Sequence, residues 1–201
     1  MATLCKKNQT RMKIGLSLEA TRVLRNTWHS AINHEWYEFL QGNEICPLVC
    51  YGKYNVKDYD VIILCGGNDM PDIKTWRDNN YPQRDKFEKE LIEDCLANNI
   101  PIVGICRGSH YINYIMGGTH KLMSEPYDNV KIQLGSLEVT CHHTIQIDRL
   151  ADHFSVLLKD DKNVIELAHS KQHRALLVGF HPERAVNAHT RSYILELIRN
   201  L

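Results

Sequence analysis

Three apolar runs constrain the fold of this chain more than any other feature. They are DVIILC at 60–65, IPIVGI at 100–105 and ALLVGF at 175–180. Apolar runs without polar alternation are typical of parallel strands that are covered on both faces. Segments with helical periodicity lie between them. Repeated strand–helix–strand units of this kind predict an α/β fold, with a mostly parallel central sheet between two layers of helices.

The intervening segments predict the helices and the remaining strands. Residues 28–40 predict a helix because apolar side chains recur there at steps of three and four. Its buried face would comprise Trp28, Ile32, Trp36, Phe39 and Leu40. A longer helix is expected at 84–98, with Asp85 as its N-cap. Two more helices are expected at 109–116 and 192–201, and shorter strands at 13–18, 45–50, 130–134, 138–140, 144–147 and 164–168. The last four strands follow one another across turns, which indicates small antiparallel additions.

Composition limits the number of domains and the kinds of partner. The chain has 201 residues, of which 43% are hydrophobic, enough for one domain, expected at 12–201. Residues 1–11 are polar and basic, which predicts a disordered extension without a secretory signal. Lys and Arg together number 24, as do Asp and Glu, so no nucleic-acid or acidic-membrane partner is expected. The sequence contains no run of 18 apolar residues, so a transmembrane helix is not expected.

The cysteines indicate the redox environment. Seven are present, an odd number, and several lie inside apolar runs, where a free thiol behaves as a small buried side chain. Without an export signal, reduced thiols in the cytoplasm are the better interpretation. Cys46 and Cys50 lack the C-x-x-C spacing, and no second pair completes a zinc site, so no metal or cofactor is expected.

The segment Gly104-Ile105-Cys106-Arg107-Gly108 carries the clearest chemical signal. A G-x-nucleophile-x-G sequence between a buried strand and a helix is typical of a nucleophile elbow. The glycines relieve steric conflict in a strained turn. The turn places Cys106 at a helix N-terminus, where the helix dipole favours the thiolate. The alternative is a buried cysteine followed by an ordinary helix start.

A second signal is His181-Pro182-Glu183, directly after the run at 175–180. A histidine at the carboxyl end of a parallel strand faces the crevice in which such folds bind ligands. Glu183 can reach the second imidazole nitrogen, which would fix the tautomer and stabilise the imidazolium. Cys106, His181 and Glu183 are therefore the predicted catalytic residues. Taken alone, His-Pro-Glu would more often be an ordinary loop.

The third signal is the pair Gly66-Gly67, which ends the run at 60–65 and precedes Asn68. Two glycines at the end of a strand let the backbone approach a ligand closely. A backbone N–H of this segment and that of Arg107 can together form an oxyanion hole. A plain strand-to-helix turn is an equally good reading of this segment alone.

Together these segments resemble the class I glutamine amidotransferase superfamily, and within it the peptidase C26-like γ-glutamyl hydrolase branch. The resemblance rests on YDVIILCGGNDM, on the stretch from RDKF through ICRG to GGTH, and on VGFHPE, in which Gly179 stands where glutamine is usual. EVTCHHT at 138–144 resembles a V-N-S-x-H-H-Q strand that lines the γ-glutamyl pocket, although Thr140, Cys141 and Thr144 differ from that pattern. His142 and His143 remain, and packing or solvent-facing histidines are the alternative.

The resemblance implies a flavodoxin-like three-layer α/β/α domain and cleavage of a γ-glutamyl amide. In such a reaction Cys106 attacks the γ-carbonyl, backbone N–H groups near Gly67 and Arg107 hold the oxyanion, and His181 protonates the leaving amine. Water then hydrolyses the γ-glutamyl thioester to glutamate. The resemblance also assigns substrate binding to a set of pocket residues: Gly66, Asn68, Arg107, His142 and His143.

The resemblance also suggests a substrate and its binding residues. The short chain and the pocket strand most resemble branch members found with capsular-polysaccharide genes, which include hydrolases of γ-glutamyl-CDP-amidate that release glutamate and cytidine diphosphoramidate. A small-molecule γ-glutamyl substrate, nucleotide-linked in that case, is the expected partner, and the oligomeric state is left open. Several residues suit a nucleoside diphosphate by residue type: Arg22, Arg25, Arg77, Arg107, Trp28 and Trp76. Two alternatives stay open, a glutaminase subunit that feeds ammonia to a synthase and a catalytically silent binding protein.

Overall fold

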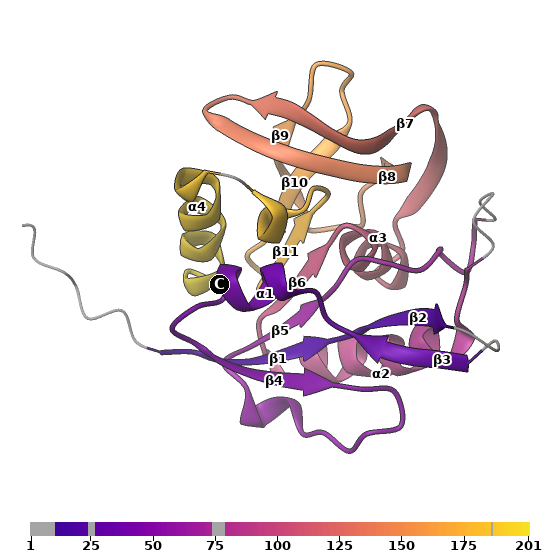
Figure 1. Cartoon of the computed structure of the whole chain (residues 1–201), viewed down its shortest axis with the longest axis vertical. Coiled ribbons are helices and arrows are strands. Elements are labelled where there is room, and N and C mark those ends of the chain that lie inside the picture. The colour runs from indigo at the N-terminus through magenta and orange to yellow at the C-terminus, as the bar shows by residue number, and fades with distance from the viewer. Residues whose placement is uncertain (1–10, 24–26, 74–78, 186) are drawn as a thin grey trace, which may run out of the picture.

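The computed structural model describes residues 11–23, 27–73, 79–185 and 187–201. Its centre is a seven-stranded sheet in the order β4-β1-β5-β6-β11-β10-β9 (Figure 1). In that order the strands are β4 (Glu44–Leu48), β1 (Lys13–Ser17), β5 (Val61–Leu64), β6 (Ile102–Ile105), β11 (Ala175–Val178), β10 (Ile165–Ser170) and β9 (Ser155–Lys159). Neighbours from β4 to β11 pair in parallel, and β10 and β9 continue the sheet antiparallel. The predicted α/β class and mostly parallel sheet are confirmed.

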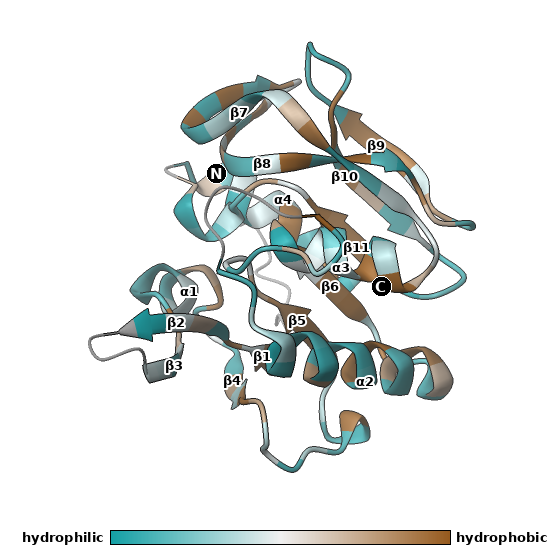
Figure 2. Ribbon diagram, turned by 90° about the vertical axis from the view of Figure 1, so that its right-hand side faces the viewer, coloured by the Kyte–Doolittle hydropathy of each residue, from teal (hydrophilic) through white to brown (hydrophobic). Residues whose placement is uncertain are grey.

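The sheet carries a separate hydrophobic core on each face. The helices are α1 (His34–Phe39), α2 (Pro82–Asn98), α3 (Arg107–Ile115) and α4 (Ala188–Arg199), with 3-10 turns η2 (Val56–Asp58) and η3 (Pro182–Arg184). Ile62 and Leu64 pack with α2 and α3 on one face, whereas Val61 and Ile63 pack with α1 and α4 on the other. Both faces of β5 are therefore buried, which is why Val61–Leu64 contains no polar residue and the strand is apolar along its length (Figure 2).

Two antiparallel hairpins lie outside the main sheet (Figure 1). One joins β2 (Glu19–Val23) to β3 (Thr27–Ala31), and the other joins the long strands β7 (Thr119–Leu134) and β8 (Leu137–Arg149). Three of the short strands expected between 130 and 147 are therefore parts of one hairpin, whose register shifts twice between Leu122 and Val130. The expected antiparallel additions are present, but β9 was not predicted.

Two local predictions were wrong. Residues 28–31 belong to strand β3, and only His34–Phe39 of the expected helix at 28–40 is helical. Pairing with β2 and the stacking of Trp28 on Tyr81, with ring centroids 4.5 Å apart, override the helical periodicity there. Asp85 does not cap α2, which begins after Tyr81 with Pro82 at its first turn.

Two further findings concern the chain as a whole. Among the described residues, no helix combines the length and the apolar character needed to cross a membrane. The extension expected at 1–11 lies almost entirely outside the described residues, which begin at 11.

Candidate active site

Cys106 lies at the junction between β6 and α3, in a strained backbone conformation with φ 51° and ψ −111°. Both flanking glycines are required there. A Cβ atom on Gly104 would lie 2.4 Å from the backbone of Gly108 and Ser109, and one on Gly108 would lie 2.3 Å from the carbonyl oxygen of Leu64. The turn is held by a hydrogen bond from the Cys106 N–H to Val178, 2.7 Å long. The geometry is that of the expected elbow, and a strained turn of this kind is typical of functional sites.

His181 and Glu183 stand at the carboxyl end of the neighbouring strand β11. The Nδ1 of His181 lies 2.6 Å from Oε1 of Glu183, and both side chains are buried. Because a carboxylate can only accept, Nδ1 carries the proton of this hydrogen bond. Nε2 is buried and makes no hydrogen bond of standard geometry with the described residues, although the ring interacts with the Cys106 thiol.

Cys106 and His181 are electrostatic partners. Burial alone would raise the pKa of the Cys106 thiol, but the charge and hydrogen bonding of His181 outweigh it, so the pKa is lowered from its ordinary value. Burial would lower the pKa of His181, but Glu183 and Cys106 together raise it to about 10. The two shifts favour a thiolate–imidazolium pair at neutral pH.

The Gly66-Gly67 segment closes over this pair. A Cβ atom on Gly66 would lie 3.0 Å from Cε1 of His181 and 3.8 Å from Sγ of Cys106, so the backbone at 66 lies directly against both groups. Gly67 has φ +104°, a backbone conformation that residues with a side chain rarely adopt. A Cβ atom there would lie 2.9 Å from Glu19. The two glycines therefore allow a close approach of the backbone, as expected.

A buried arginine that the sequence reasoning missed fixes this segment. Arg84, fully buried on α2, donates to the carbonyl oxygens of Cys65 and Gly66 at 2.8 and 2.9 Å and to Oδ1 of Asn68 at 2.9 Å. It also pairs with the buried Glu88 at 2.8 Å. Glu88 in turn contacts Arg107. One ionic network thus joins the elbow to the glycine segment.

This network occupies the side chains of two predicted substrate-binding residues. The buried guanidinium of Arg107 contacts Glu88 and lies 2.5 Å from Oδ1 of Asp85. The Asn68 side chain accepts from the Ala20 N–H at 3.1 Å and donates to the Ala20 and Asn79 carbonyl oxygens at 2.8 and 2.9 Å. Since both side chains are held within the protein, Arg107 and Asn68 can offer a substrate chiefly their backbone groups.

The β8 strand forms the opposite side of the site. The Cys106 thiol lies 3.6 Å from the carbonyl oxygen of His142, whose Nδ1 lies 3.1 Å from Asp128. His143 is buried, and its Nδ1 and Nε2 lie 2.9 Å from the Ile145 carbonyl oxygen and 3.2 Å from Glu166. Burial would lower the pKa of His143, but the interaction with Glu166 raises it overall. The structure thus brings both predicted histidines close to Cys106.

Two small hollows border the site, one at the Cys106 thiol and one at His181 and Glu183. A cavity of about 30 Å³ is lined on one side by Gly67 to Met70 and on the other by His142 to Ile145, with Cys106 and the unpredicted His110 between them. The second hollow is lined by His181 and Glu183 together with Glu19 and Trp36. The two antiparallel hairpins therefore border the predicted catalytic residues, one at each hollow.

The residues considered for a diphosphate are placed only in part. Arg25, Trp76 and Arg77 lie outside the described residues. Arg22 is exposed on β2, with its guanidinium 5.5 Å from the centroid of Trp28 on the facing strand. A cation stacked on an indole remains accessible to an anion.

Comparisons with known proteins identify similar sequences and similar folds. The chain is 29% identical over 148 residues to "Gamma-glutamyl-CDP-amidate hydrolase" of Campylobacter jejuni, an alignment covering 67% of this chain and 66% of that protein, just under two thirds of its length. It is similar in fold to PurLQS of Thermotoga maritima, with a TM-score of 0.70 and 16% identity over 95% of this chain and 99% of that one. A glutamine amidotransferase of Thermotoga maritima gives a TM-score of 0.63 and 18% identity over 96% and 84%.

The family itself is shown by the sequence. The model of the family described as Peptidase C26 matches residues 16–133, more than half of the chain, and includes Gly67 and Cys106. This match confirms the resemblance seen in the motifs and supports a glutamine amidotransferase-like hydrolase of amide bonds. The chain belongs to the Peptidase C26 family.

Proposed function

We propose that this protein is a cysteine-dependent hydrolase that cleaves a γ-glutamyl amide through a γ-glutamyl thioester on Cys106. The observation that carries the proposal is the strained elbow at Cys106, set against a buried His181–Glu183 pair 2.6 Å apart. A nucleophile, a base and a group that orients the base are the three parts that covalent acyl transfer needs.

In the first half of the reaction, the Cys106 thiolate attacks the γ-carbonyl carbon of the substrate. Charge develops on the carbonyl oxygen, and the backbone N–H groups of Gly67 and Arg107 are the proposed donors to it. The imidazolium of His181 then gives its Nε2 proton to the leaving nitrogen, and the C–N bond breaks. The products of this half are the free amine or amidate and the thioester.

In the second half, water takes the place of the leaving group. Neutral His181 accepts a proton from that water, whose oxygen attacks the thioester carbon and releases glutamate and the Cys106 thiolate. Glu183 stabilises the imidazolium at both stages and fixes the tautomer through Nδ1. Gly66, Asn68, His142 and His143 complete the proposed γ-glutamyl pocket, with Asn68 contributing its backbone.

For the leaving group we propose cytidine diphosphoramidate, released from γ-glutamyl-CDP-amidate in capsular-polysaccharide biosynthesis. The relative of that name in Campylobacter jejuni supports this choice at 29% identity. The exposed Arg22 beside Trp28 offers a cation and a ring of the kinds that bind a nucleoside diphosphate. The six described cysteines are all free thiols, which suits the cytoplasmic location that the reaction would require.

The test is a panel of γ-glutamyl amides with glutamate release as the readout. The panel includes glutamine, γ-glutamyl peptides and γ-glutamyl-CDP-amidate. We expect kcat/KM to be highest for the CDP-amidate, and higher for the wild type than for Arg22→Ala. Preference for glutamine, with turnover rising on addition of a synthase, would favour a glutaminase subunit. No turnover of any member, despite a reactive Cys106, would favour a silent binding protein.

A further inference from the structure

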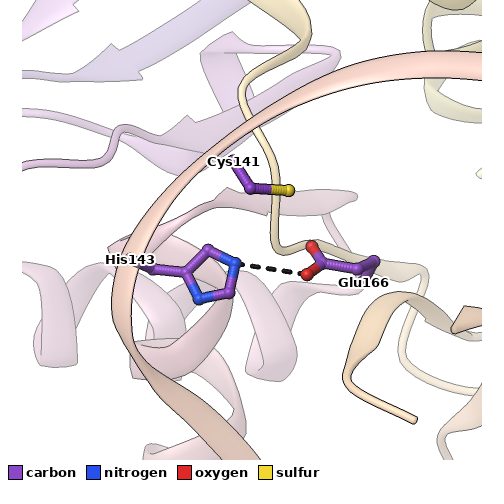
Figure 3. A group of neighbouring side chains, drawn as sticks. All are labelled: Cys141, His143 and Glu166. Atoms are coloured by element: carbon purple, nitrogen blue, oxygen red, sulfur yellow. Dashed lines mark hydrogen bonds and ion pairs between the residues drawn. The ribbon is translucent and has the colours of Figure 1, made fainter. Parts of the chain in front are cut away.

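A second group of chemically active side chains lies next to the site, on β8 and β10. Cys141 and His143 stand two residues apart on β8 and therefore point to the same face, where Glu166 of β10 meets them (Figure 3). All three are buried, at 0%, 5% and 1% exposure. One atom of each, a sulfur, a ring nitrogen and a carboxylate oxygen, lies within 4.8 Å of the others. Three donor atoms thus converge on one point inside the protein.

The hydrogen bonding prepares His143 as a ligand. Its Nδ1 lies 2.9 Å from the Ile145 carbonyl oxygen, which can only accept, so Nδ1 carries a proton. Nε2 then faces Oε1 of Glu166 at 3.2 Å and must share one proton with it. In metal sites a histidine is oriented in this way, by a carbonyl group that binds the nitrogen that is not coordinated.

Glu166 and Cys141 contribute the other two donors. Oε2 of Glu166 is buried without a hydrogen bond of standard geometry to any described residue, an unfavourable state for a carboxylate oxygen. The Cys141 thiol faces this carboxylate (Figure 3).

Gly179 makes room for this arrangement. A Cβ atom on Gly179 would lie only 2.5 Å from Oε2 of Glu166. The carboxylate therefore lies where a side chain at 179 would lie, and the absence of that side chain permits the cluster to form. Gly179, two residues before His181, is thus linked to Glu166, a residue with no assigned part in the proposed reaction.

We propose that Cys141, His143 and Glu166 bind a divalent transition-metal ion, with Zn²⁺ as the best match. A thiolate, an imidazole and a carboxylate are the three donor types that zinc takes in proteins. The ion would displace the thiol proton and the proton shared by His143 and Glu166, so the buried cluster stays neutral overall. His143 also lines the cavity beside Cys106, from which solvent can supply a fourth ligand.

The experiment measures metal binding directly and does not depend on enzyme activity. Purified, reduced protein is titrated with Zn²⁺ against a chromogenic chelator, and with Co²⁺ while thiolate-to-metal absorption is recorded. We expect one ion per chain, a thiolate absorption band, and release of about two protons on binding, measured by calorimetry in two buffers. Failure of the wild-type protein to bind either ion at micromolar concentration overturns the proposal.

Variants separate this cluster from the catalytic pair. Cys106→Ala should retain the ion, whereas Cys141→Ser and Glu166→Gln should each weaken binding at least tenfold. Cys95→Ser, at another fully buried thiol, is the matched control. Binding that is lost in Cys106→Ala and kept in Cys141→Ser places the ion at the nucleophile and overturns the proposal. If Cys141→Ser does not fold, the conservative Glu166→Gln decides, and unchanged binding by that variant also overturns it.

Discussion

The Gly66-Gly67 segment and the β7–β8 hairpin border the same thiol, but different forces hold them. The glycine segment is fixed from below by Arg84, whose fully buried guanidinium spans the carbonyl oxygens of Cys65 and Gly66. The hairpin instead forms a two-stranded sheet of its own, with register shifts and with most of β7 exposed.

Under the proposed function, the glycine segment serves the chemistry and the hairpin serves substrate selectivity. The reacting groups depend on a rigid turn and a buried ionic network, so small changes there should have large effects on activity or folding. The hairpin presents side chains to the pocket from a less constrained sheet, so changes there should alter which substrate fits. Each prediction below tests one side of this contrast.

The largest effect is expected at the nucleophile. Cys106→Ala should abolish glutamate release, a loss of at least about 10³-fold in kcat, because no other group can form the thioester. Cys46→Ser, which changes a partly exposed thiol on β4, should keep near-normal activity. Thermal unfolding of both variants checks the fold. Turnover by a folded Cys106→Ala protein would exclude the mechanism.

Loss of the base comes next. His181→Gln should lower kcat by about 10³-fold and should also raise the pKa of Cys106, because the positive charge that lowers it is gone. The rate of alkylation by iodoacetamide is measured against pH. In the wild type the rate should stay high as the pH falls below the usual range of a thiol, and in the variant its midpoint should move to higher pH. Identical profiles would argue against the thiolate–imidazolium pair.

A substitution in the ionic network should chiefly lower the free energy of unfolding. Arg84→Met leaves Glu88 with one cation fewer and two carbonyl oxygens without their donor, and should cost about 3–5 kcal/mol. Urea unfolding measures this, and Lys89→Met is the control, since its exposed pair with Glu93 contributes about 0.5 kcal/mol or less. Equal losses in the two variants would mean that Arg84 does not hold the glycine segment.

The smallest effect is expected on the hairpin. His142 contacts the thiol through its backbone carbonyl, which His142→Ala retains. KM should therefore rise by up to about tenfold while kcat stays within about twofold, since only ground-state contacts change. Steady-state kinetics with the best substrate of the panel provides the comparison. A large fall in kcat at constant KM would place the His142 side chain in the chemistry.

The same contrast explains how much the sequence could predict. The elbow and the His181–Glu183 pair are short local motifs. The glycines that the elbow needs for steric reasons, Gly104 and Gly108, lie within two residues of Cys106. Arg84 escaped detection because a charged residue in the first turn of a helix looks solvated until the fold places it beneath the neighbouring loop. The same is true of Glu166, whose meeting with His143 depends on how β10 joins the sheet.

The helix predicted at residues 28–31 was wrong for another reason. Their apolar spacing fits a helix by chance, and the pairing of β3 with β2 decides the outcome. The hairpin was predicted as fragments because its register shifts interrupt the alternation of buried and exposed side chains. The local geometry of the elbow and of the His181–Glu183 pair was therefore easier to predict than the elements that surround them.

The central claim is a γ-glutamyl thioester on Cys106, and it can be observed directly. The protein is mixed with its best γ-glutamyl substrate, quenched in acid within the first turnover, digested and examined by mass spectrometry. We predict one added glutamyl group on the peptide that contains Cys106, removed by hydroxylamine and absent from His181→Gln. A glutamyl group on another residue, or substrate turnover with no adduct in the first turnover or at steady state, would contradict the account.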